Sequence, residues 1–563
     1  MKTAQLFAGL LICGVLTACG GGSSGSSSGA LVVSPVSVSV AAGNTQQFSV
    51  TGSSGGTVTW EVNGIAGGNA SIGTISSGGL YTAPVVPPIS QPVNITATQS
   101  SMTGSAAATV TYSNSSLNGQ FIFTFDELQS GGETNTVGII TADGNGNISG
   151  TEDVRSPMNY YPSQPVTGNY TLSANGQGTL TINGGGAGTL TLTFTLVGGA
   201  VQGVLTDATT GRMGGGALYP MTAAVSSASA LNGNYIIDLG SAVVASNDNS
   251  VGLVSLSAPS INTGYMDENN GGAVTTFNSV NGNFAVGSGN QGTLSLTVGA
   301  TTHNYVFYAV SPNKLELMCI DTNCVNTGEM NIQTSKTVAS ANFVFQLTGS
   351  GTGTSPDALL ITGGMTDNGT GTGGSANFTI YENNNGFYTT ISGTTTYTVS
   401  SYGRGTMTIP TPSGPRDFVF YVQSAGYLYL LETSSGYGDT SGFASATQSN
   451  AAAVSGQYLL ITLGQIPFST TVSTTQATLH VTSSGQVTGQ GIQDNNGAIS
   501  IIPVSGKLTA SQLAGTYTML LNLGGGQTVS YVMAAVAPGV LLPIGTDTNE
   551  VRTGGLYIQY TSP

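Results

Sequence analysis

The sequence predicts an all-β protein, with an N-terminal sandwich followed by four small eight-stranded barrel or sandwich repeats. Apolar residues alternate with small polar ones over short segments, which is the period of a half-buried strand. Asn/Gly and Asp/Gly clusters between these segments favour hairpin turns. One hairpin unit, VTGNYTLSANGQGTLTI from Val166 to Ile182, returns from Val280 and Thr394 and, more loosely, from Ser505. The chain is therefore expected to contain one β module copied four times.

Length and composition exclude several classes of protein. With 563 residues the chain is too long for one hydrophobic core and suits about four or five domains. The hydrophobic fraction of 39% is too high for a disordered chain. Only nine Lys plus Arg, with a formal net charge of -15, leave no basic patch to neutralise phosphates, so nucleic acid is not an expected partner.

The first residues are typical of an export signal. Lys2 precedes an apolar run, Leu6 to Leu16, that is shorter than the roughly 20 residues needed to cross a bilayer. The LTAC stretch that ends at Cys19 resembles a bacterial lipobox, which implies a signal peptide at 1–18 and lipidation of Cys19. The alternative is an ordinary signal peptide with an incidental cysteine.

Residues 19–31 are assigned to the lipidated cysteine and a flexible Gly/Ser tether. Gly20 after the cysteine, rather than Asp, resembles lipoproteins that are passed to the outer membrane. The expected location is therefore outside the cytoplasm, with the lipid anchoring the protein to the cell envelope, at the outer membrane or cell surface.

Residues 32–113 show short alternating strands that predict a two-sheet sandwich. The stretches TVTWEVNG (Thr57 to Gly64) and GTISSGGLYTAP (Gly73 to Pro84) resemble bacterial immunoglobulin-like domains of the BIG2 type. An intersheet cysteine pair is missing, so Trp60 is expected to pack on aliphatic residues. The resemblance implies a spacer, with an adhesive module as the alternative.

Four domain-sized repeats follow. They are assigned to residues 116–222, 230–334, 339–448 and 453–563. Their opening strands align at Phe121, Tyr235, Phe343 and Tyr458, which are 114, 108 and 115 residues apart. About eight short strands per repeat predict a meander that closes into a barrel without exposed edges. A sandwich is the second choice, and two propeller blades per repeat the third.

The repeats resemble calycin-type barrels in outline, with a Gly-x-aromatic first strand. As a set, they resemble those of uncharacterised bacterial surface lipoproteins with an immunoglobulin-like domain next to the anchor. That resemblance implies a surface location but no known activity.

Few residues are suited to catalysis or metal binding. His303 and His480 lie at non-equivalent places in different repeats, so no His-based triad or zinc cluster is expected. The segment from Asp143 to Asn147 imitates the start of a calcium loop but lacks its later ligands, which favours a plain hairpin turn. No cofactor and no metal are predicted, and the protein is not expected to be an enzyme.

Four acidic residues recur near a second turn of the repeats. They are Asp153, Asp267, Glu382 and Asp494. They are interpreted as turn formers, with a weak ligand contact to carbohydrate or an ion as the alternative. Cys319 and Cys324 predict a disulfide that staples a hairpin in an exported protein. A metal site there would need two more ligands.

Aromatic pairs are the remaining indication of binding. Tyr160-Tyr161, Phe387-Tyr388 and Tyr427/Tyr429 suit stacking on sugar rings if exposed, although core packing is favoured. The expected function is surface display or adhesion, with extracellular glycans or surface proteins as candidate partners and the membrane contacted through the lipid. The alternative is a carrier that holds small apolar ligands inside the barrels.

Overall fold

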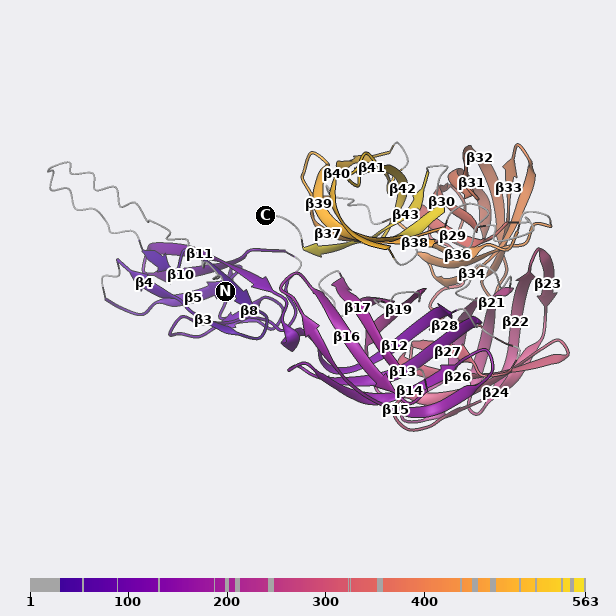
Figure 1. Ribbon diagram of the computed structural model, residues 1–563, viewed down its shortest axis with the longest axis horizontal. Helices are drawn as coiled ribbons and strands as arrows, with labels where there is room; N and C mark the ends of the chain where they lie inside the picture. Colours follow the sequence, from indigo (N-terminus) through magenta and orange to yellow (C-terminus); the bar gives the residue numbers. More distant parts are fainter. Residues whose placement is uncertain are drawn as a thin grey trace, which may run out of the picture.

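The computed structural model describes residues 31–560 except 53–54, 89, 130–131, 187, 198–201, 208–212, 241–247, 323, 325, 352–357, 436–437, 448–453, 466–471, 496–497, 512–513, 538–539 and 547–550. The described chain is almost entirely β, which confirms the predicted fold class. Figure 1 shows an N-terminal sandwich beside four barrels arranged two by two. Among the described residues, no helix has the length and apolar character to span a bilayer.

The N-terminal sandwich packs two sheets around a mostly aliphatic core that includes Trp60. Gly79 makes room for the indole, because a Cβ there would lie 2.8 Å from the Trp60 ring and 2.5 Å from the Phe48 carbonyl oxygen. One sheet has the order β2 (Ser37–Ala41), β11 (Met102–Thr111), β10 (Val93–Gln99), β5 (Thr59–Val62), β6 (Ile65–Ala66). The other has the order β3 (Thr45–Gln47), β9 (Leu80–Thr82), β8 (Gly73–Ile75), β7 (Gly68–Asn69), and β1 (Val32–Ser34) pairs with β4 (Ser49–Thr51).

The first repeat is a meander whose last strand pairs with its first, which closes barrel 1. Its strands are β12 (Asn118–Gln129), β13 (Gly132–Asp143), β14 (Asn147–Arg155), β15 (Tyr160–Leu172), β16 (Gln177–Gly184), β17 (Thr189–Val197), β18 (Gln202–Asp207) and β19 (Met213–Pro220). A short 3-10 helix, η1 (Asn114–Ser116), precedes it, and η2 (Ala228–Leu231) precedes the second repeat.

Barrel 2 has one strand interrupted. The third strand, β22, pairs with β23 at one end and with β24 at the other, while β21 pairs with β20 and β22 and so completes the ring. Its strands are β20 (Gly233–Gly240), β21 (Asp248–Ser257), β22 (Ser260–Asn270), β23 (Ala273–Phe277), β24 (Val280–Val286), β25 (Gln291–Val298), β26 (Thr301–Ser311), β27 (Lys314–Cys319) and β28 (Thr327–Ile332).

Barrels 3 and 4 are closed rings of eight strands each. Barrel 3 contains β29 (Asn342–Ser350), β30 (Ala358–Asp367), β31 (Gly373–Asn384), β32 (Phe387–Val399), β33 (Arg404–Thr411), β34 (Gly414–Ser424), β35 (Tyr427–Glu432) and β36 (Ser441–Ala446). Barrel 4 contains β37 (Gly456–Gln465), β38 (Val472–Val481), β39 (Gln486–Asn495), β40 (Ala498–Ala510), β41 (Thr516–Asn522), β42 (Thr528–Ala537), β43 (Val540–Gly545) and β44 (Val551–Tyr560). Because the strands of each repeat pair into a closed barrel, the sandwich and propeller alternatives are wrong for the repeats.

The recurring hairpin forms the fourth and fifth strands of each barrel, as the sequence predicts. Its glycine lies beneath an aromatic ring of the next strand. A Cβ on Gly292 would lie 2.1 Å from the Phe307 ring, and one on Gly405 equally close to the Phe420 ring. In barrel 4 the large ring is at the glycine position instead, because Tyr517 stands there and pairs with Met533 at the position of the aromatic residue. This exchange explains why that copy is the looser match in sequence.

The barrels dock head to tail. The first two strands of one barrel contact the sixth and seventh strands of the next: β13 contacts β26 and β27, β21 contacts β34 and β35, and β30 contacts β42 and β43. Barrel 4 then returns to barrel 1, where β44 contacts β17, as Figure 1 shows with the yellow barrel above the magenta one. This last contact uses the eighth strand of barrel 4 rather than its first two strands, so it differs from the other three junctions.

Candidate functional site

Asp153 on β14 is fully buried at the junction of barrels 1 and 2. Its Oδ2 accepts hydrogen bonds from the Tyr308 hydroxyl and the Gln291 amide of barrel 2, both at 2.6 Å. Its Oδ1 accepts one from Tyr160 of barrel 1 at 2.5 Å. Burial, with the charge of Asp153, raises the pKa of Tyr308, so the hydroxyl stays protonated and donates. This carboxylate holds two barrels together.

Asp267 on β22 makes the corresponding contact between barrels 2 and 3, and is also fully buried. Arg404 donates to it with two nitrogens, Nε to Oδ2 at 2.7 Å and Nη2 to Oδ1 at 2.6 Å. The Tyr421 hydroxyl donates to Oδ2 at 2.7 Å, and Thr276 to Oδ1 at 2.6 Å. The hydrogen bonds with Asp267 raise the pKa of Arg404 further above its usual value. Arg404 and Tyr421 occupy the places of Gln291 and Tyr308 in the preceding junction.

Glu382 is not the equivalent of these two acids. Asp153 and Asp267 pair with Val137 and Val251, each of which directly precedes the glycine of the second strand. The residue at that place in barrel 3 is Tyr381, which pairs with Thr362. Successive strand residues point to opposite faces, so a shift of one position changes the environment completely.

Tyr381 instead packs at the junction of barrels 3 and 4, against an apolar cluster. The cluster consists of Ala358, Leu360, Ile544 and Val551. Glu382 forms an ion pair with Arg416, whose Nε and Nη2 also donate to Glu432 at 2.8 and 2.6 Å. Arg416 and Glu432 are both fully buried.

The interpretation of the recurring acids as turn formers is therefore wrong for three of them, and the alternative of a weak contact to carbohydrate or an ion stays a prediction. Asp153, Asp267 and Glu382 lie within strands and are engaged with other side chains. Asp494 lies on β39, and its side chain is outside the described residues. Cys19, the predicted lipid attachment residue, also lies outside the described residues.

The signal that sequence reasoning missed is the scarcity of cations. The chain has only nine Lys plus Arg, and two of them, Arg404 and Arg416, bind the carboxylates of Asp267, Glu382 and Glu432. The buried Arg155 instead donates to backbone carbonyls, so the sequence does not show which arginines meet carboxylates.

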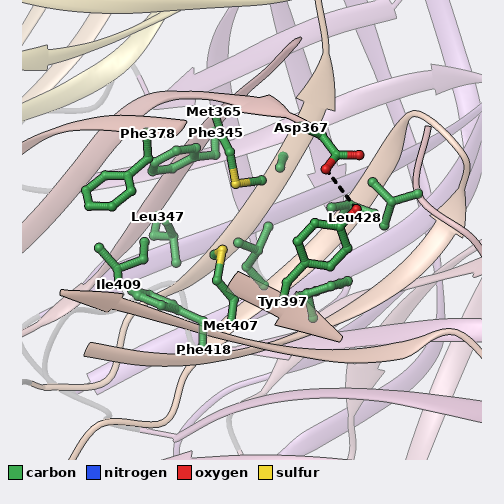
Figure 2. Close-up of a pocket in the computed structure, with 14 residues that line it drawn as sticks. Phe345, Leu347, Met365, Asp367, Phe378, Tyr397, Met407, Ile409, Phe418 and Leu428 are labelled. Atoms are coloured by element: carbon green, nitrogen blue, oxygen red, sulfur yellow. Dashed lines mark hydrogen bonds between the residues drawn. The ribbon is translucent and has the colours of Figure 1, made fainter. Parts of the chain in front are cut away.

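Barrel 3 encloses an apolar cavity of about 20 Å³. Figure 2 shows Phe345, Phe378 and Met407 filling the space around it, with Asp367 at one side. Asp367 is 5% exposed, and its Oδ1 accepts hydrogen bonds from the Tyr397 hydroxyl at 2.8 Å and from the Gly369 backbone at 2.7 Å. A single water needs roughly 10–15 Å³ on this measure, so the interior has room for about one water molecule and no larger ligand.

A second hollow, of about 380 Å³, lies at the surface between barrels 1 and 2. It is lined by Gln120, Met221, Val225 and the turn of residues 287–290. The turn residue Asn290 is buried, and its amide donates to the Ala309 carbonyl at 2.8 Å, which holds the hollow's rim in place.

Carboxyl groups with altered acidity gather where the barrels meet. Burial, with repulsion from Glu133, raises the pKa of Asp126 to about 7, and its Oδ2 accepts a hydrogen bond from Thr327 of barrel 2 at 3.1 Å. Burial, with repulsion from Glu329, raises the pKa of Asp238 to about 8. Both carboxyl groups therefore take up a proton more readily than an exposed aspartate does.

Cys319 and Cys324 form a disulfide, with their Cα atoms 5.9 Å apart. His303 lies beside them, because its ring nitrogen and the two sulfurs are all within 4.8 Å of one another. His303 itself lies on β26 with its side chain 36% exposed, and the two sulfurs beside it are bonded to each other. His480 of barrel 4 contacts the Gln457 amide at 3.1 Å.

The segment from Asp143 to Asn147 is a turn, as expected. Asp143 Oδ1 accepts hydrogen bonds from the backbone of Asn145 and Asn147, and Oδ2 accepts one from the Asn147 side chain at 2.7 Å. The Asn147 side chain contributes most to lowering the pKa of Asp143, to about 2.

The aromatic pairs differ in their surroundings. Phe387 is 68% exposed at the tip of the β31–β32 hairpin. Tyr429 is buried in the apolar contact between barrels 2 and 3, and Tyr427 packs edge-on against it with ring centroids 5.2 Å apart. Tyr160 is tied to Asp153. Of these side chains, Phe387 is the one presented to solvent.

Comparison with known proteins adds little. No family model matches the chain, and no curated protein matches it. Among solved structures, a mutant of the vaccine antigen transferrin binding protein B from Haemophilus parasuis is similar at 9% identity, over 68% of this chain and 82% of that chain. The TM-score is 0.18, so this likeness carries no argument about fold or function.

Proposed function

We propose that the chain is a non-catalytic extracytoplasmic lipoprotein, anchored through Cys19, that displays its barrels for adhesion to extracellular glycans, matrix or surface proteins. In this proposal residues 32–113 form an immunoglobulin-like spacer between the tether and the barrels. The domain limits remain those predicted from the sequence.

The observation that supports display over transport is the packing of the barrel interiors. Each barrel contains its own cluster of buried apolar side chains. The enclosed cavity of barrel 3 measures about 20 Å³, whereas small-molecule sites usually measure about 300–1,000 Å³. A carrier needs an unfilled lumen, so the packing argues against the carrier alternative.

The remaining binding surfaces are on the outside. Phe387 and Met158, which is 84% exposed, lie at the hairpin turns that follow the third strands of barrels 3 and 1. An exposed aromatic ring suits stacking on a sugar face. The buried acids at the junctions fix the barrels relative to one another, and a rigid array lets several weak contacts act together as avidity.

The test uses the full chain with Cys19→Ser, which is expected to be soluble. This protein is applied to arrays of glycans and matrix proteins and is titrated with lipophilic fluorescent probes. We expect array binding, reduced by Phe387→Ala, and no stoichiometric uptake of the probes. Leu520→Ala is the matched control, because Leu520 is 56% exposed on the wall of barrel 4, away from the hairpin tips.

Two outcomes would contradict the proposal. Stoichiometric probe uptake without array binding would restore the carrier alternative. Turnover of polysaccharide or peptide substrates by the purified protein would refute the non-catalytic assignment.

A further inference from the structure

The strands of barrel 2 bring three metal-ligating side chains together. Tyr305 on β26 pairs directly with Cys319 at the end of β27. His303 is two residues before Tyr305 and therefore lies on the same face of the sheet. Cys324 is placed at the same face, so that the ligating atoms of His303, Cys319 and Cys324 are within 4.8 Å of one another.

Barrel 3 shows that these two strand positions hold interacting side chains in this module. Phe418 pairs with Glu432 as Tyr305 pairs with Cys319, so Arg416 and Glu432 occupy the places of His303 and Cys319. Arg416 binds Glu432 there through two hydrogen bonds. Barrel 2 thus places an imidazole and a sulfur where barrel 3 places a salt bridge.

The ligand types indicate which ion such a group selects. Two thiolates and one imidazole suit zinc and other thiophilic divalent cations, which prefer tetrahedral coordination by sulfur and nitrogen. Cys319 and Cys324 are buried, and the His303 side chain is 36% exposed, so one side of the group is open to solvent. A water molecule is the natural fourth ligand at such an open position.

A carboxylate supports the imidazole. Asp321 Oδ2 lies 3.7 Å from His303 Nδ1. Asp321 is itself held by Asn304, whose backbone and side chain donate to it at 2.8 and 3.0 Å. A carboxylate beside a ligating histidine orients the ring and raises its basicity.

We propose that Cys319, Cys324 and His303 form a redox-gated site for a thiophilic divalent cation such as Zn²⁺. In the disulfide form the sulfurs are bonded to each other and the site is closed. Two molecules of a thiol reductant become one disulfide and deliver two electrons and two protons to the sulfurs, which opens the site. Binding of M²⁺ then releases both thiol protons, because the thiolate is the ligand.

The test uses the purified chain from residue 19 onward with Cys19→Ser, whose cysteines are Cys319 and Cys324. The protein is reduced by a thiol and desalted without oxygen. It is titrated with Co²⁺, which reports thiolate ligation by a charge-transfer band in the near ultraviolet. We expect one equivalent to bind the reduced protein and none to bind the disulfide form. His303→Ala should weaken binding at least tenfold, and Asp321→Asn by about 10–100-fold. His480→Ala, the other histidine, should bind as the parent does.

Alkylation provides a second measurement that does not depend on the spectrum. Zn²⁺ should protect both thiols of the reduced protein from N-ethylmaleimide, and circular dichroism should show that each variant remains folded. The proposal is refuted if the reduced, folded protein gives no thiolate band and no protection. It is also refuted if His303→Ala binds Co²⁺ as tightly as the parent.

Discussion

Replacing Asp267 by alanine should loosen barrel 3 from barrel 2. The carboxylate is fully buried and accepts four hydrogen bonds, two from Arg404 and one each from Tyr421 and Thr276. Removing one partner of a buried ion pair costs about 3–5 kcal/mol, because the other charge is left without compensation. We therefore expect Asp267→Ala to lower the free energy of junction opening by about that amount.

Further variants separate the loss of the Asp267–Arg404 attraction from the cost of leaving one of these charges buried without its partner. Arg404→Ala leaves the carboxylate with Tyr421 and Thr276, and Tyr421→Phe removes one hydrogen bond to a charged group, which is worth about 1.5–3 kcal/mol. In the double variant Asp267→Ala/Arg404→Ala neither charge is stranded. Its cost should fall short of the sum of the single variants by about 1–3 kcal/mol.

The assay is native-state hydrogen exchange on the full chain, because a protein of several domains does not unfold in one step. Protection should fall in β21 and β34, which contact each other across this junction, while the sandwich strand β10 serves as internal control. If Asp267→Ala changes the opening free energy of these strands by less than about 0.5 kcal/mol, the carboxylate is not what holds the junction.

Three further predictions concern the barrel core, pH and the anchor. Gly405→Ala should destabilise barrel 3 by about 1–3 kcal/mol, measured by native-state hydrogen exchange of β33 and β34, since the new Cβ would lie 2.1 Å from the Phe420 ring. Adding Phe420→Met should restore part of the loss. The pKa values of Asp126 and Asp238 in the folded protein, about 7 and about 8, are raised above the value in the unfolded chain. Between about pH 4 and pH 8 the folded state therefore binds more protons than the unfolded state. The free energy of unfolding should fall as the pH rises through this window and then level off. Melting temperatures at pH 5 and pH 9 measure this pH dependence of stability. Asp126→Asn should reduce the difference between the two temperatures, and an unchanged difference would contradict the role of Asp126. Cys19→Ser should move the protein from the membrane fraction to the soluble fraction of the cell envelope, and an unchanged membrane fraction would rule out the lipid anchor.

Local pattern was sufficient for the architecture of the repeats. Alternation and turn residues are properties of neighbouring positions, so the strands opening at Phe121, Tyr235, Phe343 and Tyr458 and the recurring hairpin are visible in the sequence. Closure into barrels also follows, because a meander of about eight strands removes its edges by pairing its ends.

The residues that neighbour Asp267 and Glu382 in the sequence indicate turns, whereas both acids lie within strands. The sequence DENNGG resembles a turn, and Asp267 is near one, but the residue lies inside β22 and its partners are 137 and 154 positions away in barrel 3. Glu382 has similar neighbouring residues in the sequence, but strand pairing shifts it by one position relative to Asp267.

The sequence by itself determined the all-β class and the four copies of one module, because each depends on composition or on contacts between neighbouring strands. Only the tertiary structure decided that the interior of barrel 3 is filled, that Asp153 and Asp267 fasten successive barrels, and that His303 meets Cys319 and Cys324. The contacts of Asp153 and Asp267 join residues 137 to 155 positions apart, and no local periodicity encodes them. His303 and Cys319 lie on paired strands of one hairpin, but their meeting depends on the pairing register and on the loop that contains Cys324, which alternation alone does not fix.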